Sequence, residues 1–199
     1  MVNKYENLLT TMPETSYFIT YEQMNTIITF QRLWNELAIW MRFFVYSAIY
    51  ETPNASEILN RLYRVGTDFY YAISVFYGPE VAQTFVNLLS NFITNSCGII
   101  NSMKIREEAV NAYTSKLYEN ADTLAKFLSQ INPYWDENQW RYLLYKYIKY
   151  KIEEIVSIMI GNYQQEIAVV DELNDVTAIM GSYMARGIIA KNLISQTPN

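Results

Sequence analysis

Apolar residues recur along this chain at the spacing of an α-helix, and the alternation typical of β-strands is scarce. Turn-forming residues interrupt the pattern at only a few places. The predicted helices span residues 21–50, 56–77, 79–103 and 107–131, followed by a helical segment from about 137 to 190. Because the connections are short, we predict an all-α, antiparallel bundle of about six long helices.

Helix boundaries are marked by residues that cap helices or break them. Pro53 ends the first helix, and Ser56 fits the N-cap of the second. Asp136 fits the N-cap of the last segment, with Gln139 three residues later completing a capping box. That segment contains one further break, Gly161-Asn162, so it is either two separate helices or one kinked rod.

A faint repeat of 55 residues runs through the chain. Leu37, Phe92 and Tyr147 fall 55 residues apart, each on the apolar face of a helix. Two interpretations remain open: three stacked αα-hairpins, or chance agreement among amphipathic helices of similar length. We expect residues 1–20 to form an N-terminal arm, 21–193 a single bundle domain and 194–199 a flexible tail.

One stretch of twenty residues, 84–103, has no charged residue and is long enough to span a bilayer. It nevertheless carries Asn87, Asn91 and Asn95 on one side of the helix, and such amides are costly in hydrocarbon unless they are paired. We therefore predict no membrane span. The stretch is expected to be the central helix of the bundle, with its asparagines in hydrogen bonds between helices or subunits.

Composition excludes several classes of function. The chain has no histidine and one cysteine, which removes Ser-His and Cys-His catalytic pairs, and Cys97 is expected to be a buried structural thiol. A net charge of −5 argues against nucleic acid and anionic membrane surfaces as partners. The six glycines are dispersed, so no phosphate loop is present, and we expect no cofactor. The first residues show no secretory signal, which predicts synthesis in the cytoplasm.

Residues 140–151 mix basic and aromatic side chains. Such mixing can bind single-stranded nucleic acid, but the acidic whole favours a protein contact, with Tyr142, Tyr145 and Tyr150 as candidate interface residues. The acidic pair Glu153-Glu154 is expected on a solvated face. An aromatic pocket around Trp34 and Trp40 is a further alternative, although such clusters are more often plain core.

Several stretches resemble a family of uncharacterised helical proteins from spore-forming bacteria. They are LWNELAIWMR, RLYRVGTDF, FYGPEVAQTFVNLLSNFI, ENADTLAKFLSQINPYW, YQQEIAVVDELNDV and ARGII, within residues 30–190. Members are sometimes labelled acetylglutamate kinase, a label that does not fit a chain without glycine-rich phosphate loops. The family is similar in turn to metalloprotein-like bundles, so the resemblance implies ferritin-like packing and a metal-binding ancestry.

This chain departs from the family pattern at the positions that matter for a metal. Family members carry an acidic or polar residue followed by His near the middle of several helices. The corresponding pairs here are Glu36-Leu37, Asn91-Phe92, Lys146-Tyr147 and Asn174-Asp175. Every such His is gone, so the resemblance implies a degenerate site in which Phe92 and Tyr147 act as packing residues. Only Glu36 and Asp175 remain as carboxylate candidates for a metal, and Arg32, one turn before Glu36, is placed to pair with it.

Two functions follow from these observations. The first is a non-catalytic helical bundle that acts by self-association or by binding a protein partner, and the family context places it in a spore-related assembly. The alternative is a residual carboxylate-based metal-binding protein of the ferritin-like type. In either case we expect twelve residues to lie in the core: Leu33, Leu37, Trp40, Leu62, Phe69, Leu88, Phe92, Leu117, Leu124, Leu144, Ile148 and Ile155.

Overall fold

The computed structural model describes residues 19–102 and 107–195, and within these ranges every regular element is an α-helix. The helices are α1 (Tyr21–Tyr50), α2 (Ala55–Tyr77), α3 (Pro79–Ser102), α4 (Glu107–Ile131), α5 (Glu137–Met159) and α6 (Tyr163–Ser195). The predicted all-α bundle of about six helices is confirmed. The question left open at Gly161-Asn162 is resolved in favour of two helices, because the chain reverses direction there with Gly161 at a φ of 70°.

Local hydrogen bonds explain where the helices begin. Asp136 caps α5 as predicted, since its carboxylate accepts from the Gln139 backbone N–H at 2.7 Å. The predicted capping box is not completed, because the Asp136 backbone N–H donates to the Tyr183 hydroxyl of α6 at 2.6 Å. The prediction for Ser56 was wrong: α2 begins one residue earlier, at Ala55, and the Ser56 hydroxyl donates to Glu57 instead. At the start of α1, the backbone and side chain of Thr20 exchange hydrogen bonds with Gln23 in a capping box.

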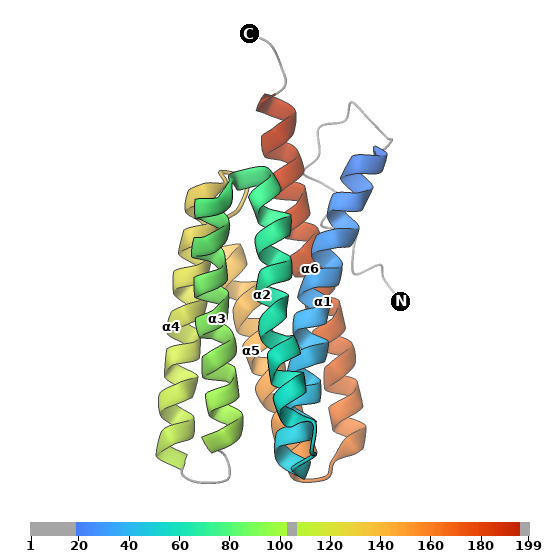
Figure 1. The fold of residues 1–199 in the computed structure, drawn as a ribbon, viewed down its shortest axis with the longest axis vertical. Coiled ribbons are helices and arrows are strands. Elements are labelled where there is room, and N and C mark those ends of the chain that lie inside the picture. Colours follow the sequence, from blue (N-terminus) through green and yellow to red (C-terminus); the bar gives the residue numbers. More distant parts are fainter. Residues whose placement is uncertain (1–18, 103–106, 196–199) are drawn as a thin grey trace.

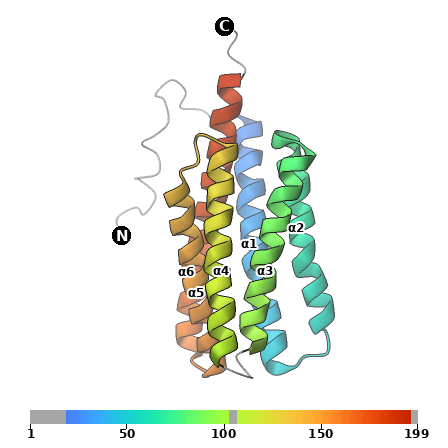
Figure 2. The ribbon, with the colours of Figure 1, turned by 90° about the vertical axis from the view of Figure 1, so that its left-hand side faces the viewer.

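The six helices form a closed ring in which each helix packs against its neighbours in the chain (Figure 1). The ring closes where α6 returns beside α1. Helix α1 also contacts α3 and α5 across the interior. Figure 2 shows α3 and α4 lying side by side on the face opposite α6, and the C-terminal end of α6 extends beyond the other helices. None of the helices in these ranges is long and apolar enough to span a bilayer.

The core lies along the axis of the ring. Ten of the twelve predicted core residues are buried, and the exceptions are Trp40 and Leu88, which are half-buried. Trp40 sits where α1 meets α2, with the guanidinium of Arg61 5.0 Å from its ring, so one face of the indole is covered by a cation rather than by core. Trp34 is fully packed, with the ring of Trp140 at 6.0 Å, so the aromatic cluster belongs to the core and does not line a pocket.

Burial follows the 55-residue spacing seen in the sequence. Helices α1, α3 and α5 bury equivalent positions, and this agreement is what a repeat of αα-hairpins requires. The matching sets are Leu37, Phe92 and Tyr147; Ala38, Ile93 and Ile148; Met41, Ser96 and Lys151; and Val45, Ile100 and Ile155.

Two of the three asparagines of α3 do not behave as predicted. Asn87 and Asn91 are exposed, and Asn87 accepts a hydrogen bond from Gln83 of its own helix at 2.9 Å. Only Asn95 bonds between helices, to Asn120 of α4. The physical reason is that the apolar residues of α3 already fill its inward stripe, which leaves the Asn side of the helix to water.

Candidate functional site

The inward members of the predicted degenerate site are packed together at the centre of the bundle. Leu37, Phe92 and Tyr147 are each at most 1% exposed. The rings of Phe92 and Tyr147 lie 5.8 Å apart at an interplanar angle of 53°. The Tyr147 hydroxyl is buried and has no hydrogen-bond partner among the described residues. Burial is the main reason why its pKa is raised, and the charge of Glu154 adds to the effect.

The other members of that set lie away from the centre. Asn91 is exposed, and Lys146 lies over the rings of Tyr142 and Tyr150 at 5.4 and 5.9 Å. Asn174 is exposed and accepts from Asn35 of α1 at 3.3 Å, while Asp175 is half-buried. The structure therefore does not bring the eight residues together as one constellation.

Glu36 is bound by two arginines. Its carboxylate pairs with Arg32 at 2.5 Å, as the sequence predicts, and with Arg61 of α2 at 3.0 Å. The guanidinium groups thus take both carboxylate oxygens. Within the described ranges no group of three or more His, Cys, Asp or Glu residues is placed to hold a metal ion.

A buried charge network, which the sequence analysis missed, lies between α1, α5 and α6. Lys151 and Glu154 of α5 form an ion pair, and Glu154 also pairs with Arg42 of α1 at 3.0 Å. Arg42 pairs in turn with Glu166 of α6. The Lys151 ammonium donates to the backbone carbonyl of Ala38 at 3.3 Å. The four side chains carry two positive and two negative charges, so the network is balanced.

Burial and pairing act against each other in this network. Burial lowers the pKa of Lys151, and the neighbouring Glu154 opposes that effect. The pKa of Arg42 is raised because its bonds to the two carboxylates outweigh desolvation. Burial also raises the pKa of Tyr46, with Glu166 adding to it. The prediction that Glu154 faces solvent was wrong, since its side chain is 0% exposed.

The periodicity of α5 could have revealed these inward charges. Leu144, Tyr147 and Ile148 are buried, and Lys151 and Glu154 continue the same stripe at helical spacing. The cavity beside them measures only about 20 Å³, which holds a single water molecule and no substrate. The network therefore ties three helices together and offers no room for chemistry.

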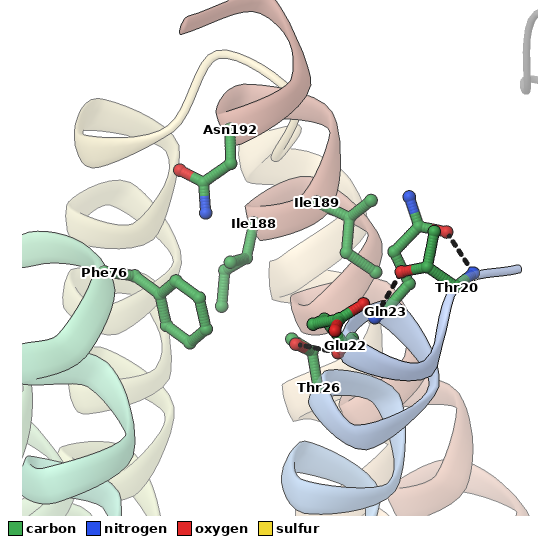
Figure 3. A pocket seen from close by; sticks show the side chains of 8 residues that line it. All are labelled: Thr20, Glu22, Gln23, Thr26, Phe76, Ile188, Ile189 and Asn192. Carbon is green, nitrogen blue, oxygen red and sulfur yellow. Dashed lines mark hydrogen bonds between the residues drawn. The ribbon is translucent and has the colours of Figure 1, made fainter. Parts of the chain in front are cut away.

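Two larger hollows open near the ends of the bundle. One, of about 400 Å³, lies between α1, α2 and α6. Figure 3 shows that Phe76 faces Ile188 there and that Glu22 lies on the opposite wall. The other, of about 410 Å³, lies near the C-terminal ends of α1 and α3 and includes Glu51. Each has one ionisable side chain among its described lining residues, so neither presents an acid–base pair.

The three candidate interface tyrosines have different surroundings. Tyr142 is 55% exposed. The Tyr145 hydroxyl donates to Asp122 of α4 at 2.9 Å, and Tyr150 donates to Glu172 of α6 at 3.1 Å. Only Tyr142 is thus free to serve as an outward anchor, because the other two hydroxyls hold α5 to its neighbours.

The most distinctive surface lies on α1. Six of its nine exposed positions carry large apolar or aromatic side chains, which share one side of the helix. We call this stripe the α1 face; its residues are Tyr21, Met24, Ile28, Ile39, Phe43 and Tyr50. By contrast, the exposed positions of α3 and α4 are polar or charged apart from Pro79 and Ala112. The sequence could have revealed this face, because apolar residues lie on two sides of α1, whereas a helix that only packs on a core is apolar on one side.

No protein family, no curated protein and no solved structure matches this chain.

Proposed function

We propose that this chain is a non-catalytic helical bundle that works through contact with another protein surface, either a copy of itself or a protein partner. The α1 face carries the proposal. Scattered apolar residues are normal on a protein surface, but apolar side chains gathered on one side of a helix are typical of an interaction site. The stripe runs the length of a 30-residue helix, which is about 45 Å long.

The chemistry of the interior supports the same proposal. The buried carboxylates of Glu154 and Glu166 are paired with cations, and the cavity beside them admits no substrate. Cys97 is buried, and burial raises its pKa to about 12, so its reactive thiolate form is suppressed. These side chains fit structural roles.

Sedimentation velocity over a wide range of concentrations tests the proposal. We expect the sedimentation coefficient to rise with concentration as copies associate. A chain that stays monomeric throughout would exclude self-association. In that case, a Phe43→Glu variant should abolish binding to whatever partner is isolated. Retention of full binding by this variant would remove the α1 face as the contact surface.

A further inference from the structure

The α1 face has a symmetric order of side chains along the helix. Tyr21, Met24 and Ile28 lie toward one end, and Ile39, Phe43 and Tyr50 lie toward the other. The stripe between them is polar, with Arg32 exposed and Asn35 half-buried. Reversing the helix about its midpoint, near Asn35, superposes Ile28 on Phe43 and Tyr21 on Tyr50, and places Arg32 on Ile39.

This order suits an antiparallel partner of the same sequence. In a two-fold interface, residue i of one copy contacts residue j of the other, and j contacts i. With the axis near Asn35, Ile28 lies opposite Phe43 of the second copy, and Tyr21 lies opposite Tyr50. The Tyr50 hydroxyl is 3.0 Å from that of Tyr163 on α6, so the first turn of α6 widens the surface that receives Tyr21.

The charges favour the antiparallel direction over the parallel one. Arg32 and Glu36 form an ion pair at the middle of the helix, and their side chains are 56% and 21% exposed. An antiparallel copy in this register places each Arg32 within about one turn of Glu36 in its partner, and the two Glu36 side chains lie side by side between the two arginines. A parallel copy would place Arg32 beside Arg32, which is repulsive.

We propose that α1 pairs antiparallel with α1 of a second copy of this chain, across a two-fold axis near Asn35, with Ile28 against Phe43. This pairing rests on the proposed function, because it names the partner and the register of the same surface. It leaves the outward faces of α3 and α4 in water, as their polar residues require.

Directed cross-linking tests the register. Chains carrying Ile28→Cys and chains carrying Phe43→Cys are mixed under mild oxidation, with Cys97 buried in both. We expect a cross-linked dimer from the mixture. Neither chain alone should give one, because the two Ile28 positions are about 22 Å apart in this register. Mixing Ile28→Cys with Thr123→Cys, on the polar face of α4, is the matched control. Cross-linking of each variant with itself, or none above the control, would overturn the proposal.

A charge introduced into the stripe tests whether the face is used at all. We expect Phe43→Glu to abolish the dimer in sedimentation while leaving the helical circular dichroism signal intact, whereas Thr123→Glu should leave the dimer unchanged. A wild-type oligomer that survives Phe43→Glu would overturn this pairing and leave the proposed function standing. A monomeric wild type would overturn both the pairing and self-association. Dimer formation only after removal of residues 1–18 would assign the face to that segment instead.

Discussion

Gly181 of α6 lies directly against the backbone of Gln31 of α1. A Cβ atom at Gly181 would come within 2.4 Å of the Gln31 Cα, which is too close for any side chain. Nearby, the Gln31 amide donates to Ser182 at 2.8 Å. This close approach is where α6 closes the ring on α1.

We expect Gly181→Ala to destabilise the bundle by about 1–3 kcal/mol, because the added methyl group forces two backbones apart. Gly66→Ala is the matched control. Its Cβ would meet Val86 at an ordinary 3.4 Å, and alanine favours a helix over glycine by about 1 kcal/mol. Urea unfolding of both variants measures the difference, and a Gly181→Ala variant as stable as wild type would refute the close contact.

Tyr147→Phe should stabilise the chain by about 1 kcal/mol, because it removes a buried hydroxyl that has no partner. The control is Tyr77→Phe. The Tyr77 hydroxyl accepts from Asn132 at 2.7 Å, so its loss leaves a buried amide unsatisfied and should destabilise. Equal effects of the two substitutions in thermal unfolding would contradict the assignment.

The pH dependence of the free energy of unfolding, compared between wild type and Tyr147→Phe, gives an independent check. The pKa of Tyr147 is raised in the fold, whereas an unfolded tyrosine ionises near pH 10. The stability that this group contributes is present below pH 10 and is lost as pH rises above it. Tyr147→Phe lacks that contribution, so its free energy of unfolding should fall less steeply above pH 10 than that of wild type. Parallel curves would count against burial of the phenol.

Two adjacent glutamates should differ sharply. Glu154→Gln removes a buried charge and leaves Lys151 and Arg42 incompletely compensated, which should cost about 3 kcal/mol. Glu153→Gln breaks only an exposed pair with Lys149, 3.8 Å away, and should change the free energy of unfolding by less than about 0.5 kcal/mol. Chemical denaturation of the two single variants decides the matter, and similar losses would argue against the buried network.

A chelator should leave the melting temperature unchanged. The carboxylate of Glu36 is already paired with Arg32 and Arg61. Removing metal ions with a chelator therefore breaks no contact that stabilises the fold. Elemental analysis of the untagged protein should find no stoichiometric iron, manganese or zinc. A bound metal, or a fall in melting temperature with chelator, would revive the carboxylate-based alternative.

The sequence anticipated the helices well because their boundaries are set by local chemistry. Pro53 and the Asp136 cap act within a few residues, so their effect can be predicted without tertiary information. The apolar stripes likewise placed ten of twelve core residues correctly. The spore-former resemblance and its ferritin-like packing stay predictions.

The sequence by itself determined an all-helical chain, the approximate bounds of its first four helices and most of its core, because capping and periodicity depend on neighbours in the chain. Only the tertiary structure decided which polar groups are buried. Lys151 and Glu154 look like ordinary surface charges until α1 and α6 bring Arg42 and Glu166 to them. The packing of the helices also decided that Asn87 and Asn91 face water and that the apolar side of α1 stays outside. Those outcomes depend on which helices become neighbours, because helical spacing shows that a residue lies on an apolar stripe but does not show which distant residue meets it there.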